Sequence, residues 1–306
     1  MMVKYERPYS HAAHWARHIA LFAFLLLCAS VLFHRFGPLT TPHLLALMAV
    51  SIGLAAIAVI LALIGLVRLW QVAAKGGFAA FTAVLLSLLP LGMIGLATVA
   101  YFTRPAIHDV STDLADAPPW IVTPKADQGW LQPQAAVTSA DRAAQLAAYP
   151  ALTGRRYDGA LDRVLLGVRT VAEKTGLKIT QERGAENAAA DLEDMVINPE
   201  TSLPEEKTAE KKLQTVPVPL DRPQSGPQAG DIPIRPNEIL LQGEWRTLVI
   251  GFRLDVVIRL REEAETTFVD LRVASRYGTH DLGGAAGYAD QYLRALDAEL
   301  LGIAGD

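Results

Sequence analysis

The chain has 306 residues, of which 51% are hydrophobic and 20% charged, and its formal net charge is −4. This slightly acidic balance argues against a nucleic-acid partner, because nucleic-acid binding usually requires a strongly basic surface. The only cysteine, Cys28, excludes an intramolecular disulfide and a metal site built from several thiolates.

Three apolar stretches precede residue 103, at 19–36, 44–67 and 78–102, and none has a charged residue in mid-span. Each has the roughly 18 to 25 residues needed to cross a bilayer as a helix. A cleavable signal peptide is the alternative for the first stretch, but two further stretches follow and no convincing cleavage site separates them. The sequence therefore predicts a three-span membrane anchor over residues 1–103.

Basic residues near the span ends are distributed unequally between the two sides. The cytoplasmic side of a membrane protein carries the excess of Lys and Arg, so the N-terminus is predicted to be cytoplasmic. Three crossings then place residues after Thr103 in the periplasm of a Gram-negative cell, with the anchor in its inner membrane. The first side carries Lys4, Arg7, Arg17, Arg68 and Lys75, and the second carries Arg35 and Arg104.

His11, His14 and His18 follow a helical spacing before the first span, which would suit a metal site. No carboxylate or cysteine lies close enough to complete one, so we expect these residues to lie at the membrane interface and predict no metal or other cofactor. The spans also lack ionisable residues that would indicate a transport path.

After the anchor, residues 107–120 should be extended, because Pro118 and Pro119 oppose a helix. We interpret residues 104–148 as an extended linker that also begins the soluble domain. Asp158 is a candidate N-cap for a helix that ends at Gly176, with a strand over 177–182. This helix has a shared apolar face, formed by Leu161, Val164, Leu165, Val168 and Val171.

Residues 184–236 are acidic and then proline-rich, which is typical of a surface excursion or a linker. The core resumes at Glu238. Even-numbered positions from Leu248 to Leu260 are apolar, which predicts one long strand, or two strands joined near Gly251.

Val269, Leu271 and Val273 alternate with charged residues in another strand, and Gly278 then marks a turn. Asp281 stands where an N-cap would precede the last helix. An antiparallel sheet with two helices on one face, an α+β domain over 149–306, follows from these elements. The apolar positions of the last helix are Leu282, Ala286, Ala289, Leu293, Leu296, Leu300 and Ile303.

Four segments resemble one known family over about residues 105–303. They are IHDVSTD at 107–113, YPAL at 149–152, DVVIRL at 255–260 and VDLRVASRYGTHDLG at 269–283. The chain resembles members of the domain of unknown function family 1499. It departs from them at 284–288, where relatives often carry Asn and then Arg. The resemblance implies a membrane-linked domain and brings no established reaction, cofactor or catalytic residues.

Charged residues gather on the non-core face of the predicted strands, and this face is the best candidate site. Guanidinium groups there could bind a phosphate or carboxylate of a lipid headgroup or envelope polymer. Two structural alternatives exist. Asp and Arg could simply pair across strands on a solvated face, or residues 107–120 could cover this face and bury the pairs. The candidate binding residues are Arg259, Asp270, Arg272, Ser275, Arg276 and Asp281.

Ser275, His280 and Asp281 contain the side-chain types of a hydrolase triad, but triads are assembled from separated segments, and no nucleophile elbow is present. The sequence thus favours a periplasm-facing domain that binds an envelope component or a membrane protein partner. An envelope hydrolase using groups near Ser275 and His280 remains the alternative.

Overall fold

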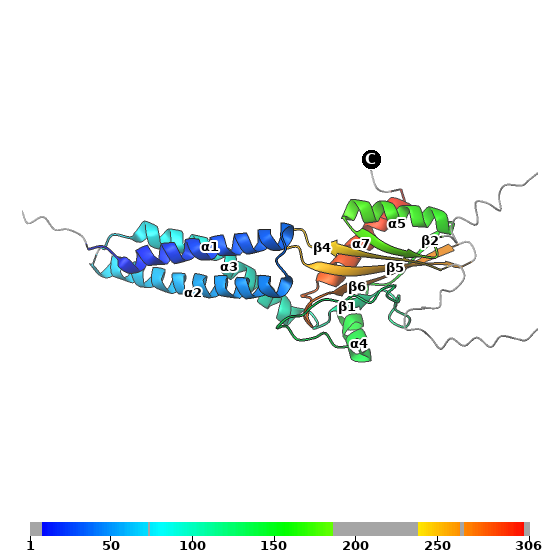
Figure 1. The fold of residues 1–306 in the computed structure, drawn as a ribbon, viewed down its shortest axis with the longest axis horizontal. Helices are drawn as coiled ribbons and strands as arrows, with labels where there is room; N and C mark the ends of the chain where they lie inside the picture. The colour runs from blue at the N-terminus through cyan, green and yellow to red at the C-terminus, as the bar shows by residue number, and fades with distance from the viewer. Residues whose placement is uncertain (1–7, 73, 186–237, 264–265, 303–306) are drawn as a thin grey trace, which may run out of the picture.

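A computed structural model describes residues 8–72, 74–185, 238–263 and 266–302. The described chain is elongated, with a rod of three helices at one end and a mixed domain at the other (Figure 1). The predicted excursion at 184–236 falls almost wholly outside these residues, as do Lys4, Arg7 and Ile303.

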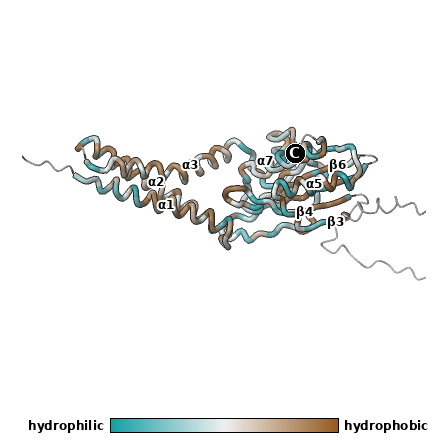
Figure 2. The backbone as a smooth tube through the Cα atoms, turned by 90° about the horizontal axis from the view of Figure 1, so that it is seen from above, coloured by the Kyte–Doolittle hydropathy of each residue, from teal (hydrophilic) through white to brown (hydrophobic). Residues whose placement is uncertain are grey.

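The rod consists of α1 (His11–Phe36), α2 (Thr41–Val72) and α3 (Gly77–Thr103), each long and apolar enough to cross a membrane. Small residues allow the three helices to approach closely. At Gly65, for example, an added Cβ would lie 2.8 Å from the Cβ of Ala13. The large apolar side chains point outward, and the rod is hydrophobic along most of its length (Figure 2). Its buried contact consists of Ala13, Ala16, Ala20, Ala58, Ala62, Ala80 and Ala83.

The flanking basic residues that the structure describes are divided between the two ends of this rod. Ser10 and Lys75 are joined by a backbone hydrogen bond of 3.0 Å, so the start of α1 lies beside the α2–α3 connection, far from the domain. Arg35, in the last turn of α1, and Arg104, directly after α3, lie at the opposite end and contact the domain. The three predicted spans are thus confirmed as three apolar helices.

The domain is built on one antiparallel sheet. Its strands are β1 (Asp109–Ser111), β2 (Arg155–Asp158), β3 (Lys178–Arg183), β4 (Glu238–Arg246), β5 (Arg253–Glu263) and β6 (Thr266–Ser275). The order is β1-β6-β5-β4-β3, and β2 pairs with a different part of the same β6 edge as β1. β5 and β6 pair over ten residues, with Arg259 directly opposite Asp270.

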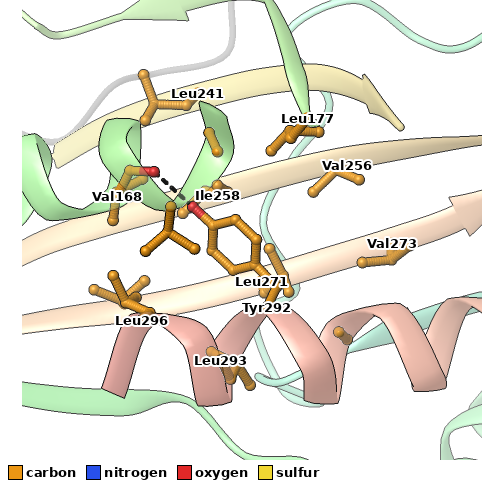
Figure 3. Packing of buried hydrophobic residues seen from close by; sticks show 14 of the residues in the cluster. Val168, Leu177, Leu241, Val256, Ile258, Leu271, Val273, Tyr292, Leu293 and Leu296 are labelled. Atoms are coloured by element: carbon orange, nitrogen blue, oxygen red, sulfur yellow. Dashed lines mark hydrogen bonds between the residues drawn. The ribbon is translucent and has the colours of Figure 1, made fainter. Parts of the chain in front are cut away.

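Two helices, α5 (Leu161–Thr175) and α7 (Gly284–Leu300), cover one face of the sheet, as the sequence predicts. Between these layers lies a core in which Tyr292 is fully buried, and its hydroxyl donates a 2.8 Å hydrogen bond to the carbonyl of Val168 (Figure 3). Tyr288 and Tyr292 belong to this core although the apolar spacing did not select them. Leu282 lies ahead of α7 and remains 37% exposed.

One local prediction is wrong, and a second leaves two alternatives between which the structure decides. Asp158 does not cap α5, because it ends β2, and the N-cap is Ala160, which has no side-chain cap. Residues 248–252 form the β4–β5 turn, so the alternation is not one long strand. Two strands joined near Gly251 is the confirmed alternative, since Gly251 has a φ of +84°. The alternation runs past the start of β5 because Leu248 and Ile250 of the turn are also apolar.

A third helix, α4 (Ser139–Ala148), interrupts the region predicted as extended linker. Thr138 and Asp141 form a capping box at its start, a Thr-x-x-acid signal that was present in the sequence. α4 lies on the side of the sheet opposite α5 (Figure 1). The preceding residues, 112–137, cross this second face without regular structure, and we call them the strap.

Candidate functional site

The strap covers the charged face of the sheet. Trp120 and Ile121 pack against Leu240 and Val257, forming a small apolar contact on this face. Gln242 fixes the same part of the strap by accepting from the amide of Val122 at 3.0 Å and donating to its carbonyl at 2.8 Å. The structure thus favours the covered face over the solvated one, because the side chains lie between two layers of chain.

Arg259, on β5, is the centre of this layer and is only 1% exposed. Its Nη2 donates to Asp270 at 2.8 Å and to Asp113 of the strap at 2.9 Å, and its Nη1 donates to Asp116 at 3.1 Å. Burial disfavours the charged guanidinium, but these carboxylates, Asp270 above all, raise the pKa of Arg259 above its ordinary value. Arg259 thus stays charged and ties the strap to β5 and β6.

Arg272, on β6, joins a second group of contacts. It donates to Asp109 of β1 at 3.0 Å and to the carbonyl of Pro118 at 3.0 Å. Its guanidinium lies 4.8 Å from the centre of the Trp120 ring, and Arg142 of α4 binds the same Asp109 at 2.9 Å. These contacts use most of the donors of Arg272, so its main role is to hold β1, the strap and β6 together.

Arg276 follows β6 and neutralises two carboxylates that face each other. Glu244 and Asp255 are directly opposite on β4 and β5, a like-charge pairing that is unfavourable by itself. Arg276 donates through Nε to Asp255 at 2.7 Å and contacts Glu244 through Nη2 at 2.9 Å. Its hydrogen bond with Asp255 raises the pKa of Arg276 in spite of burial.

The remaining candidates have local structural roles. Ser275 donates to the carbonyl of Tyr277 at 2.9 Å. Asp281 accepts from the amides of Gly283 at 2.8 Å and Ala285 at 2.7 Å, so its side chain caps the start of α7 as predicted, although the N-cap position itself is Gly283. Burial raises the pKa of Asp281 in spite of these hydrogen bonds.

His280 does not approach Ser275 as a catalytic base would. Its Nδ1 accepts from the amide of Leu282 at 3.0 Å, which leaves the proton on Nε2 to be donated to the carbonyl of Tyr101 at 3.1 Å. The imidazole also stacks on the Tyr101 ring. Within the described residues, both ring nitrogens are used at the junction with α3, and no Ser–His hydrogen bond forms.

Two cavities flank the strap at residues 120–125, with volumes of about 610 Å³ and 820 Å³. The two cavities are neighbours, and we call them together the groove. They share the lining residues Trp120, Thr123, Pro124, Lys125, Asp255 and Arg276. Lys125 is exposed and makes no ion pair with any residue that the structure describes. Arg272 and Ser275 line the first cavity, whereas Arg259, Asp270 and Asp281 do not.

Sequence reasoning thus found Arg272, Ser275 and Arg276 of this groove and missed Trp120 and Lys125. Trp120 lies at the end of the segment that the sequence singled out as extended, but no pattern placed it over Arg272. No spacing or motif marks Lys125, which reaches the groove only through the path of the strap.

A family model described as "Protein of unknown function (DUF1499)" matches residues 109–296, which is more than half of the chain. The chain belongs to this family. No curated protein and no solved structure matches it. The match begins at β1 and ends within α7, so it covers the sheet, the strap and both core helices and leaves out the three apolar helices.

Proposed function

We propose that this family member is anchored in the inner membrane of a bacterium with its domain in the periplasm, where the groove beneath the strap binds an anionic component of the cell envelope. The observation that carries the proposal is a preformed groove whose lining has four cations and three anions. The cations are Lys125, Arg183, Arg272 and Arg276, and the anions are Asp109, Glu244 and Asp255.

The paired arginines are fixed, so a ligand would be held mainly by the groups that are still available. These are the Lys125 ammonium, together with Nη1 of Arg276, which has no hydrogen-bond partner among the described residues. Both groups favour a phosphate or carboxylate. A lysine and part of one guanidinium suit a single anionic group more than a densely charged polymer such as nucleic acid.

The groove also lies close to the apolar helices. Gln128 lines it, and two residues later the Trp130 indole donates to the carbonyl of Pro42, at the start of α2, at 3.1 Å. This proximity favours the phosphate of a membrane lipid over a component that lies far from the membrane. An anionic polymer offers the same chemistry and is the second source to test.

Lipid retention tests the groove. The detergent-solubilised full chain is incubated with phosphatidylglycerol or with phosphatidylcholine, and the retained lipid is counted by native mass spectrometry. We expect selective retention of phosphatidylglycerol, reduced several-fold in Lys125→Gln and unchanged in Lys178→Gln, an exposed lysine on β3. Equal retention by the parent chain and both variants would contradict the proposal. Retention of isolated envelope polymer in place of lipid would identify the polymer as the ligand.

Orientation has its own test, since it is argued from the basic residues that flank the spans. An alkaline phosphatase fusion after Asp113 should be active, because that enzyme matures only in the periplasm. A green fluorescent protein that folds only in the cytoplasm should stay dark at the same position. The reverse pattern would place the domain in the cytoplasm.

A further inference from the structure

The turn between β4 and β5, residues 247–252, carries the most exposed aliphatic side chains of the domain. Leu248 is 81% exposed and Val249 is 76% exposed. The turn is tightly hydrogen bonded within itself, since the Thr247 hydroxyl accepts from the amides of Gly251 at 3.1 Å and Phe252 at 2.9 Å. Leu248 and Val249 are therefore presented on a well-defined turn.

Two hydrogen bonds hold this turn at the end of the first apolar helix. His34 Nδ1 donates to the carbonyl of Ile250 at 2.8 Å, and Arg35 Nη1 donates to the carbonyl of Thr247 at 2.8 Å. Both donors lie in the last turn of α1, where the apolar span ends. The turn thus lies at the level where a span passes from lipid to water.

The end of α1, which holds the turn, is itself rich in exposed apolar side chains. Leu32, Phe33 and Phe36 in the final turns of α1 are 56%, 63% and 82% exposed. A large apolar patch on a soluble surface usually marks an interaction site. Here, hydrogen bonds hold the patch at the end of a helix that is long and apolar enough to span a membrane, so a lipid is the occupant that the geometry favours.

Behind the turn lies an open groove of about 510 Å³. Trp245 forms part of it, with its indole nitrogen satisfied by the carbonyl of Thr175 at 3.0 Å and its ring packed on Tyr288 at 4.4 Å between centroids. The indole nitrogen of Trp245 is therefore satisfied before any ligand enters. The lining is Lys174, Thr175, Trp245, Thr247, Leu248, Val249, Ile250, Phe252 and Gln291.

We propose that the β4–β5 turn dips into the boundary of the membrane that α1, α2 and α3 cross, and that the groove behind it accommodates the acyl chain of a phospholipid. This inference rests on the membrane anchoring in the proposed function, but not on the anion groove. Aliphatic side chains such as Leu248 and Val249, and an aromatic ring such as that of Trp245, are residue types that partition into the membrane–water interface.

Site-specific fluorescence on the full chain tests the position of the turn. In a Cys28→Ser background, a polarity-sensitive label is attached to Leu248→Cys, Leu166→Cys or Leu96→Cys, and the proteins are reconstituted in phosphatidylcholine vesicles with or without brominated acyl chains. Leu166 lies on the outer face of α5 and is 67% exposed, and Leu96 lies within α3 and is 76% exposed. These two serve as the water-facing and lipid-facing controls.

We expect brominated lipid to quench the labels at 248 and 96 at least twofold and to leave the label at 166 unchanged. Aqueous iodide should quench only the label at 166. A label at 248 that behaves like the one at 166 would overturn the proposal, as would a label protected from both quenchers, which would indicate a covering protein. Failure of the label at 96 to respond to brominated lipid would instead refute membrane anchoring itself.

Photocrosslinking tests the groove separately from the tip. Phosphatidylcholine with a diazirine near the end of one acyl chain should label residues 245–252 and also Gln291 of α7, which lies on the far wall of the groove. Replacing Gln291 with Trp should fill the groove and abolish its labelling, while the labelling of Leu248 remains. Adducts confined to Leu248 and Val249 would show contact with lipid but overturn the acyl-chain site.

Discussion

Replacing Arg276 with Gln leaves Glu244 and Asp255 facing each other across β4 and β5 without a shared cation. Arg276 is 19% exposed and Asp255 is 5% exposed at their side chains, so water can replace little of the lost interaction. Removing one partner of a buried ion pair costs about 3 to 5 kcal/mol. We expect the free energy of unfolding at pH 7 to fall by that amount.

The dependence of stability on pH should also change sign. In the parent chain burial opposes ionisation of Glu244, but a hydrogen bond from Arg246 and the charges of Arg276, Arg253 and Arg246 lower its pKa. A carboxylate whose pKa is lowered in the folded state stabilises the fold at pH values above its unfolded-state pKa of about 4.3. This stabilisation is lost as the pH falls through the folded-state pKa.

Without Arg276, repulsion should raise the apparent pKa of the carboxylate pair above the unfolded value. The variant should then gain stability as pH falls from 7 to 5, about 1.4 kcal/mol for each unit by which the pKa is raised. The parent chain should gain nothing from this pair over the same range.

Thermal unfolding of the detergent-solubilised full chain, followed by tryptophan fluorescence at several pH values, measures both effects. Arg294→Gln is the matched control. Arg294 pairs with Asp290 on the surface of α7, where the two side chains are 75% and 51% exposed. This pair should contribute less than about 0.5 kcal/mol to the free energy of unfolding. Arg276→Gln combined with Asp255→Asn should regain much of the stability. An unchanged melting temperature, or parallel pH profiles, would refute the assigned role of Arg276.

Three further predictions concern the strap and the sheet. Arg259→Met should leave the buried Asp270 with Arg261, at 3.2 Å, as its remaining cation and cost about 3 to 5 kcal/mol, with faster proteolysis of residues 112–137. An intact strap would contradict the role of Arg259 as its tie. Gly154→Ala should cost about 1 to 3 kcal/mol in a thermal melt, because its Cβ would lie 2.5 Å from Asp270 Oδ1. Gly287→Ala, with no atom within 4 Å, is its control and should be neutral or stabilising. Deleting residues 186–234 and closing the gap with a short loop should preserve cooperative unfolding, because Arg183 and Leu240 are already paired neighbours.

Much of the fold follows from patterns that act over short distances. The three apolar helices follow from length and hydropathy, and β6 and the apolar face of α5 follow from their periods of two and 3.6 residues. The errors arise where two signals coincide. Leu248 and Ile250 extended the alternation of β5 through a turn, and Asp158 was chosen as a cap although it pairs with Thr266 in the sheet.

The site was harder to predict because burial on the second face of the sheet is a long-range property. Alternation correctly put Arg259 and Arg272 on the non-core face. Burial of that face beneath residues 107–120 is one of several alternatives, and no pattern in the sequence favours it over a solvated face. Two prolines at 118 and 119 predicted an extended segment without indicating what it packs against. Because residues 112–137 cover this face, the arginines that alternation places on it form buried ion pairs.

This arrangement also explains how the two segments that most resemble the family act together although they lie far apart in the chain. Asp109 and Asp113 come from the first segment, and Asp270 and Arg272 come from the second, yet Arg272 binds Asp109 directly, and Arg259 binds both Asp113 and Asp270. A carboxylate at either end of such a contact would be costly to bury alone. The paired motifs therefore specify the closure of the strap over the sheet, and the groove beside Lys125 exists only because that closure occurs.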